Sequence, residues 1–181
     1  IDNKKIGTIK YIESNRLNWG RFQTKISTLL SLAPHDVSIV HYLLGYEPFT
    51  NIQYKGIKFT NKIQNDIDTY HFRCKKIDIK FNLSWYYPAK IRTMAIIGTK
   101  GMIHWDEEKQ EVIFYDNLWI NDRMNYESTS HPSIYNIECN PLRNQIKDFV
   151  NCVEDSTKPF SDVDCAINVA KNLDLLNRYT S

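Results

Sequence analysis

Apolar and polar side chains alternate along most of the middle of this chain, and this period of two limits the fold more than any other feature. The alternating runs lie within residues 51–115, and short turn-like segments such as 98–101 separate them. Alternation of this kind is typical of strands with one buried face, and short turns join antiparallel neighbours. We therefore predict an antiparallel meander whose strands are 52–59, 70–74, 77–85, 91–97, 102–105 and 112–115.

The two ends of the chain add one more strand and three helices. Residues 6–19 also alternate, which predicts a long strand. Apolar residues recur at helical spacing over 34–44, 141–153 and 163–173. Residues 117–139 are polar, and we expect an irregular surface excursion there. With the helices gathered on one face of the sheet, the expected fold is a two-layer α+β domain.

Length and charge narrow the class of protein. At 181 residues the chain is large enough for one domain with its own core. Its 23 basic and 21 acidic residues are spread along the sequence, so we expect neither nucleic acid nor a membrane as a partner. We interpret the four cysteines as reduced thiols of a cytoplasmic protein, although an even number also allows disulfides. The first methionine is Met94, so we expect the chain to be part of a longer one.

Two common kinds of site are missing from the sequence. None of the six glycines belongs to a GxGxxG or P-loop motif, which lets the backbone approach the phosphates of a nucleotide. The cysteines form no CxxC pair, and His71, His104 and His131 lie in separate segments without ligand spacing. We therefore expect neither cofactor-binding residues nor metal ligands in this chain.

His35 is the strongest catalytic candidate. It stands between Pro34 and Asp36, at the start of the first predicted helix. The residues alone allow two interpretations. One is a structural histidine at a helix start, where Asp36 complements the helix dipole. The other is a general base that removes a hydroxyl proton during hydride transfer.

Two groups of hydrogen-bond donors are candidates for substrate binding. Arg16 and Asn18 lie two residues apart at the end of the first predicted strand, and therefore on the same side of it. Together they suit a sugar hydroxyl, a carboxylate or a phosphate. Tyr87, Lys90 and Arg92 form a second group on both sides of Pro88, at a bend. Both groups are also compatible with ordinary polar residues at a strand end or an exposed sheet corner.

Four stretches in this order carry a resemblance to a known family: IGTIKYIESNRLNWG, LAPHDVSIVHYLLG, SWYYPAKIRTMAIIGTKGMIHWDEE and NPLRNQIKDFVNCVEDSTKPFSDVDCAINV. They resemble the C-terminal domain of the Gfo/Idh/MocA oxidoreductases, and most of all the branch that oxidises nucleotide-linked amino sugars or their uronates. The resemblance covers nearly the whole chain. It implies an α+β domain on a large open, mostly antiparallel (mixed) sheet, with helices on one face and oligomer contacts on the other.

The resemblance also implies roles for particular residues. His35 matches the family histidine that acts as an acid/base or orients the substrate beside the carbon that loses hydride. Arg16 and Asn18 match a strand-end motif that lines the sugar pocket in similar proteins. The expected site residues are therefore His35 for catalysis and, for substrate binding, Arg16, Asn18, Ser31, Asp36 and Lys90.

The resemblance places the cofactor outside this chain. Residues 1–181 are then a single C-terminal substrate-binding and oligomerisation domain. A Rossmann domain upstream of residue 1 is expected to bind NAD or NADP and to supply a catalytic lysine, so this fragment alone should bind no cofactor and be inactive. The implied function is the substrate-binding half of a NAD(P)-dependent dehydrogenase that oxidises a ring hydroxyl of a nucleotide-linked sugar to a ketone. The expected partners are a sugar or nucleotide sugar and further copies of the chain.

Ser31 departs from the family pattern. The family often has an aspartate four residues before the histidine, as in WDLAPHD, whereas this chain reads LSLAPHD. A serine forms hydrogen bonds but does not stabilise an imidazolium as a carboxylate does. Either Asp36 or the lysine of the missing half compensates, or the activity is altered. Ser31 supports one alternative function, a non-catalytic assembly or regulatory homologue. A separate alternative is a family member that acts as a redox-assisted hydrolase or lyase.

Overall fold

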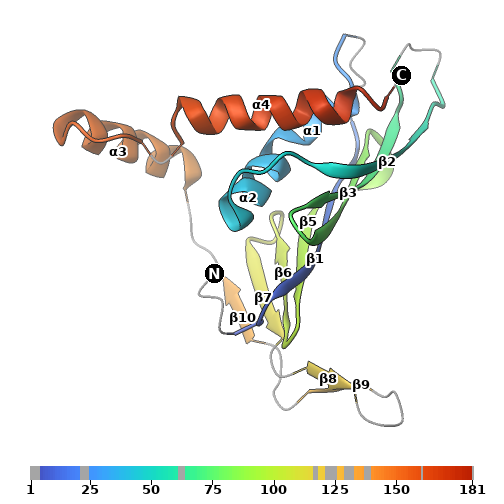
Figure 1. Cartoon of the computed structure of the whole chain (residues 1–181), viewed down its shortest axis with the longest axis horizontal. Coiled ribbons are helices and arrows are strands. Elements are labelled where there is room, and N and C mark those ends of the chain that lie inside the picture. Colours follow the sequence, from blue (N-terminus) through green and yellow to red (C-terminus); the bar gives the residue numbers. More distant parts are fainter. Residues whose placement is uncertain are drawn as a thin grey trace.

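The computed structural model of the chain describes residues 5–20, 25–60, 64–115, 118–120, 126–128, 133–136, 140–159 and 161–180. In this part the chain forms one large sheet, one small two-stranded sheet and helices on one side (Figure 1). The strands are β1 (Ile9–Trp19), β2 (Thr50–Ile57), β3 (Ile67–Cys74), β4 (Ile77–Ser84), β5 (Tyr86–Gly98), β6 (Met102–Asp106), β7 (Glu111–Tyr115), β8 (Leu118–Ile120), β9 (Tyr126–Ser128) and β10 (Ser133–Asn136). The helices are α1 (Thr28–Leu32), α2 (Pro34–Leu44), α3 (Pro141–Glu154) and α4 (Val163–Asn177).

The large sheet has eight strands in the order β10-β7-β6-β5-β1-β4-β3-β2. Strands β2, β3 and β4 pair antiparallel, and so do β5, β6 and β7, which confirms two parts of the predicted meander. Strand β1 lies between these parts, parallel to β4 and antiparallel to β5. The sheet is therefore mixed and mostly antiparallel, as expected. An uninterrupted meander is wrong, because β4 and β5 are neighbours in sequence but lie on opposite sides of β1.

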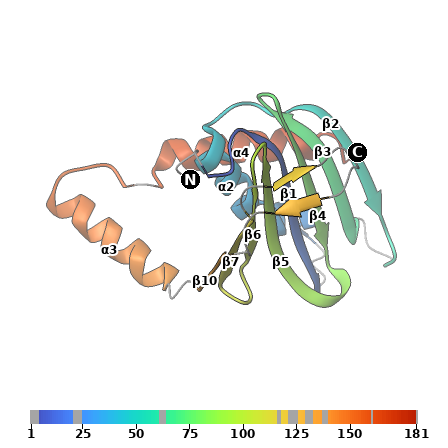
Figure 2. The same ribbon diagram turned by 90° about the horizontal axis from the view of Figure 1, so that it is seen from below.

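One face of the sheet is covered by helices and contains the core. Figures 1 and 2 show α1, α2 and α4 on the same side of the sheet, as the two-layer fold predicts. The alternation along β1 points Ile12 and Arg16 toward this face, and both are buried. Leu29, Val37 and Leu176 bring α1, α2 and α4 respectively into the same core. Burial of these apolar side chains drives the packing of the helices on the sheet.

The junction of α1 and α2 sets the direction of the first residues of α2. Ala33 ends α1 and directly precedes Pro34, whose missing N–H costs nothing at the first position of a helix. Two hydrogen bonds hold the start of α1 in place. The Ser27 side chain accepts a hydrogen bond from Leu30 N, and the Thr28 hydroxyl donates to the buried carboxylate of Asp68 in β3. This anchoring orients the segment that contains Ser31 and His35.

Helix α3 forms where the pattern predicts it, but it extends away from the sheet (Figures 1 and 2). Asn140 caps it by accepting a hydrogen bond from Arg143 N at 3.0 Å, and Pro141 occupies its first turn. None of its side chains is buried in the described part of the chain. Its apolar stripe, made of large side chains at helical spacing, is exposed: Leu142, Ile146, Phe149, Val150 and Val153.

The segment 117–139 lies partly outside the described residues. Its described parts are strands rather than irregular structure: β8 pairs with β9, and β10 pairs antiparallel with β7. The expectation of an irregular excursion is wrong for these parts. Strand β10 forms against the free backbone edge of β7, a partner that the sequence of the segment itself does not reveal.

Two further expectations can be compared with the structure. No helix within the described ranges is both long and apolar enough to cross a membrane. Cys74, Cys152 and Cys165 form no disulfide among the described residues, and Cys139 lies outside those residues.

Candidate functional site

A polar cavity of about 670 Å³ opens between the α1–α2 junction and the strands β1, β5 and β6. Four of the six predicted site residues, Arg16, Ser31, His35 and Lys90, line it although they come from separate elements. The other polar side chains that line the cavity are Ser38, Arg92 and Glu107. A cavity of this size and polarity suits a small polyhydroxylated ligand.

Arg16 is the most constrained side chain of the cavity. It is buried on the central strand β1, and its Nε lies 2.7 Å from Oδ1 of Asp36, which is also buried. Its Nη2 lies 3.2 Å from Oε2 of the partly exposed Glu107. Burial raises the pKa of Asp36, and the neighbouring Arg16 offsets part of that effect. Two carboxylates therefore fix the guanidinium of Arg16 at the base of the cavity.

Asp36 itself does not line the cavity. Its carboxylate points from the first turn of α2 to Arg16, so its contact with the site goes through that side chain. Asn18 is also outside the lining, where its Oδ1 accepts a hydrogen bond from Nη2 of Arg92 at 3.4 Å. The structure thus places these two predicted residues behind the cavity, next to side chains that line it.

Ser31 and His35 reach the cavity from its helical wall. They are four residues apart, across the junction of α1 and α2, and both side chains are exposed. The spacing that places one residue above another on a helix is retained here because a single residue separates the two helices. His35 is therefore accessible to a ligand, as a general acid or base must be.

Strand β5 supplies the third side of the cavity. Lys90 is mostly exposed, and its Nζ lies 2.8 Å from Oε1 of Glu108. Arg92 lies two residues further on and pairs in register with Arg16 of β1, so both arginines point to the helix-covered face. Burial and the charge of Arg16 lower the pKa of Arg92.

Sequence reasoning identified Arg92 only as a neighbour of Lys90, and it missed Ser38, Glu107 and the aromatic lining residue Trp105. Ser38 follows His35 by about one helical turn, so helical spacing could have indicated it. The other residues come from β5, β6 and the turn after β6. Their position at the site depends on the pairing of β5 with β1, which no local pattern contains.

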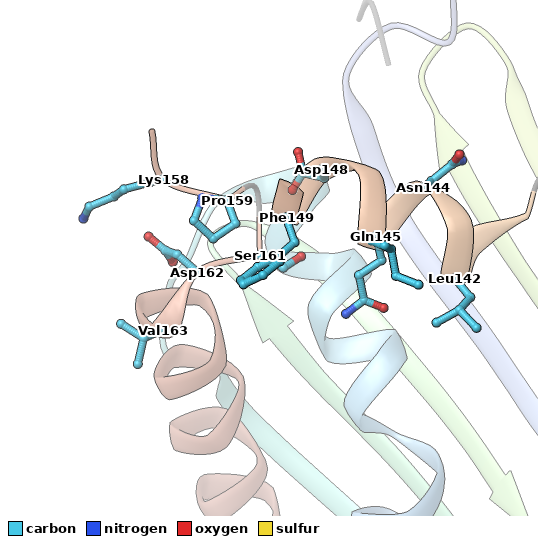
Figure 3. A pocket seen from close by; sticks show the side chains of 11 residues that line it. Leu142, Asn144, Gln145, Asp148, Phe149, Lys158, Pro159, Ser161, Asp162 and Val163 are labelled. Atoms are coloured by element: carbon cyan, nitrogen blue, oxygen red, sulfur yellow. The ribbon is translucent and has the colours of Figure 1, made fainter. Parts of the chain in front are cut away.

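Two other cavities have mainly apolar surfaces. One, of about 500 Å³, adjoins the polar cavity and shares Ile39, Trp105, Glu107 and Pro141 with it. The other, of about 900 Å³, lies between α3 and the start of α4 (Figure 3). In Figure 3 the ring of Phe149 lies next to Pro159, while Lys158 points away from the cavity. At the rim of the cavity beside α3, the carboxylate of Asp162 accepts a hydrogen bond from Cys165 N and caps α4. We interpret this cavity as an uncovered surface of the two helices.

The described residues contain no group of three or more histidine, cysteine, aspartate or glutamate side chains that could hold a metal ion. Within the polar cavity the candidate groups for proton transfer are the imidazole of His35 and the carboxylate of Glu107. The candidate groups for binding hydroxyls or an anion are the two arginines, Lys90 and the two serines.

The fold and the cavity define a class of protein: an α+β domain with an open sheet and a cavity lined by polar side chains under its helices. The family model described as "Oxidoreductase family, C-terminal alpha/beta domain" matches residues 1–175. The chain therefore belongs to the Gfo/Idh/MocA oxidoreductase family, as the resemblance predicts, and it corresponds to the C-terminal domain of that family.

Solved structures with the same fold include several sugar dehydrogenases. UDP-N-acetylglucosamine 3-dehydrogenase GnnA from Acidithiobacillus ferrooxidans superimposes with a TM-score of 0.78 at 18% identity, over 96% of this chain and 54% of that one. A levoglucosan dehydrogenase in complex with NADH and levoglucosan has a TM-score of 0.74 at 16% identity, over 99% of this chain and 58% of that one. The WlbA dehydrogenase from Bordetella pertussis, in complex with NADH and UDP-GlcNAcA, has a TM-score of 0.69 at 14% identity, over 99% and 54%.

These comparisons show the fold and the family. The chain spans little more than half the length of the structures it matches. No protein of curated function matches the sequence significantly. Identities of 14–18% transfer no residue roles, so the roles at this site are argued from its own geometry.

Proposed function

We propose that this chain is the substrate-binding domain of a NAD(P)-dependent sugar dehydrogenase and that His35 exchanges a proton with the substrate hydroxyl. One observation carries the proposal: Arg16, Ser31, His35 and Lys90, which come from separate elements, meet in one cavity. Membership of an oxidoreductase family supports the reaction class. The structural relatives in complex with NADH and levoglucosan, or with NADH and UDP-GlcNAcA, support a sugar or nucleotide sugar as the substrate class.

The cofactor that the family implies does not fit the residues of this chain. None of the six glycines forms the GxGxxG pattern of a dinucleotide site, and the polar cavity is lined by side chains rather than by a helix start in contact with glycines. In a NAD(P)-dependent dehydrogenase, bound NAD(P) would supply the hydride acceptor. We assign to this chain only the steps that its own side chains perform.

Those steps are binding, orientation and proton transfer. Arg16, held by Asp36 and Glu107, presents fixed donors to the oxygens of the sugar. Ser31 and Ser38 offer hydroxyls that both donate and accept hydrogen bonds. His35 accepts the proton of the hydroxyl that becomes a ketone, because a neutral imidazole ring has one nitrogen that accepts a hydrogen bond and can take up a proton. Asp36 is a positioning residue that acts through Arg16.

The test is steady-state formation of NAD(P)H by the longest gene product that contains this chain, with a panel of sugars and UDP-sugars. We expect His35→Ala to lower kcat about 100-fold or more, the usual scale for the loss of a general acid or base. His71→Ala is the matched control, since that histidine lies on β3 outside the cavity. Activity of the His35 variant within twofold of the parent would exclude the proposed role.

A second candidate, a non-catalytic homologue used for assembly or regulation, rests on Ser31. The structure puts this neutral side chain in the cavity, while the carboxylate of Asp36 is engaged with Arg16. Only Glu107 contributes a carboxylate to the described lining of the cavity. If the longer gene product oxidises no sugar of the panel but still binds one, the non-catalytic function is favoured.

A further inference from the structure

Two arginines lie directly opposite each other on the neighbouring strands β1 and β5, in the middle of the sheet. This pairing of like charges needs an explanation. Arg16 of β1 and Arg92 of β5 are direct partners in the antiparallel register and point to the same cavity. Like charges directly opposite each other in a sheet are destabilising. A fold that keeps them there, partly removed from water, gives up stability at this position. Such a cost is typical of a functional site rather than of a structural one.

Only one of the two arginines forms a salt bridge with the described residues, although the carboxylates of Glu107, Glu108 and Asp36 act on Arg92 from a longer distance. Arg16 contacts two carboxylates, those of Asp36 and Glu107, at 2.7 and 3.2 Å. Arg92 contacts the neutral amide oxygen of Asn18 at 3.4 Å, a long hydrogen bond. The Nη1 atom of Arg92 is buried and has no hydrogen-bond partner among the described residues. Lys90, the third cation of the cavity, is paired with Glu108.

We infer that Arg92 binds an anionic group, a carboxylate or a phosphate, carried by the sugar-sized ligand of this cavity. An anion between the two guanidinium groups offsets their repulsion and supplies the acceptors that Arg92 lacks. The planar fork of a guanidinium suits the two oxygens of a carboxylate or phosphate. The neutral hydroxyls of the ligand are left to Ser31, Ser38 and His35.

This inference deepens the proposed function, because it takes from it that the ligand is a sugar. It adds that Arg92 selects sugars with an acidic substituent over neutral ones. Selection of this kind is a difference of affinities between two ligands of the same shape. It can therefore be measured by binding alone, without hydride transfer.

The experiment is a titration of the whole chain with D-glucuronate, D-glucose 6-phosphate and D-glucose, followed by ¹⁵N NMR of the backbone and of the arginine Nε–H groups. We expect one of the two acidic sugars to bind at least about tenfold more tightly than glucose, as a charge-assisted hydrogen bond implies. The acidic sugar that binds shows whether the anion is a carboxylate or a phosphate. Inorganic phosphate, added alone, is expected to bind more weakly than the sugar.

Arg92→Gln removes the charge and keeps an amide donor. It should reduce the affinity for the acidic sugar about tenfold or more, and by a larger factor than it reduces the affinity for glucose. Arg143→Gln is the matched control, since it removes the same charge from the exposed helix α3. Because Arg92 opposes Arg16, Arg92→Gln should also leave the melting temperature unchanged or raise it. A fall of more than a few degrees would assign Arg92 a structural role and overturn the inference.

Two further results would overturn it: equal affinity of the chain for glucose and both acidic sugars, or the same affinities in Arg92→Gln as in Arg143→Gln. The proposed function can fail separately. If the longer gene product oxidises no sugar while this chain keeps its preference for acidic sugars, the dehydrogenase proposal falls and the role of Arg92 stands. If the longer product oxidises sugars but Arg92→Gln changes its kcat/KM for acidic and neutral sugars by the same factor, the role of Arg92 falls and the dehydrogenase proposal stands.

Discussion

Asp36 and Arg16 form the most deeply buried ion pair in the described part of the chain. Their side chains are 1% and 8% exposed, and the pair joins the start of α2 to the central strand. Burial raises the pKa of Asp36 even though the neighbouring Arg16 lowers it, so it costs free energy to keep this carboxylate ionised in the fold. Stability alone therefore does not explain the ion pair. The pair instead fixes a guanidinium at the base of a cavity that a ligand can enter.

Removal of Asp36 should show how much free energy it costs to bury Arg16 without this partner. We expect Asp36→Ala to lower the free energy of unfolding by about 3–5 kcal/mol, because it leaves Arg16 buried with only the partly exposed Glu107 as a counter-ion. The matched control is Asp78→Ala, which breaks an Arg–Asp pair of similar length between exposed side chains. Urea unfolding at pH 7 measures both. Equal losses in the two variants would contradict a buried, structurally constrained Arg16.

At the scale of elements, one asparagine connects α4 with α2 and with the segment that leads into β2. The buried side chain of Asn172 accepts a hydrogen bond from Phe49 N at 3.0 Å and donates to the carbonyl of Glu47 at 2.9 Å. Its Nδ2 also lies 2.9 Å from Nε2 of His41, on α2. An amide nitrogen only donates, so His41 must keep Nε2 unprotonated to accept this bond.

This contact predicts a pH dependence of stability. Burial lowers the pKa of His41, so the unfolded chain binds a proton at higher pH than the folded chain does. Stability from this group is complete above the unfolded pKa of about 6.5 and is lost as the pH falls through the folded pKa. We therefore expect the free energy of unfolding to fall from pH 7.5 to pH 5, by at most about 1.4 kcal/mol per pH unit for one proton.

The comparison that isolates His41 is His41→Gln against His71→Gln. Glutamine can still accept the hydrogen bond from Asn172 but does not titrate, so the first variant should lose the part of the slope that His41 contributes. His71 is exposed on β3, and its replacement should leave the slope nearly unchanged. Urea unfolding at several pH values measures the slopes. The same slope in both variants would show that His41 does not cause it.

At the scale of the whole molecule, the open face of the sheet has a polar centre. The Nδ2 of Asn82 donates to Asn15 at 2.7 Å and to Glu13 at 3.1 Å, and the Nζ of Lys80 lies 3.4 Å from Glu13. Apolar side chains occupy the same face toward β6, and Ile97 is among the exposed ones. A face with a polar network beside apolar residues is compatible with the expected contact between copies of the chain.

Self-association through this face is a prediction that light scattering can check. We expect the chain to be larger than a monomer at tens of micromolar, and we expect Ile97→Glu to dissociate it, since a charge would then be buried at the contact. Phe149→Asp, on the apolar stripe of α3, is the control that leaves the sheet face unchanged. A monomeric parent chain would exclude the contact. Dissociation by the α3 variant alone would locate it elsewhere.

The sequence by itself determined the elements of this protein. The strand predicted at 77–85 is observed as Ile77–Ser84, and the strands predicted at 102–105 and 112–115 match β6 and β7 to within a residue at either end. The helices predicted at 34–44, 141–153 and 163–173 also form. These elements were predictable because periods of 2 and 3.6 residues, prolines and capping side chains are local properties of the chain. The same local patterns pointed to His35, Arg16 and Lys90, whereas Ser31 came from the family resemblance.

Tertiary structure alone decided how these elements meet. The insertion of β1 between β4 and β5 brings Arg16 opposite Arg92 and turns two separate groups of donors into one cavity. It also withdraws Asp36 and Asn18 behind the lining and adds Glu107 and Ser38. No local pattern contains this information, because strand pairing between residues more than 70 positions apart depends on the total burial and hydrogen bonding of the sheet.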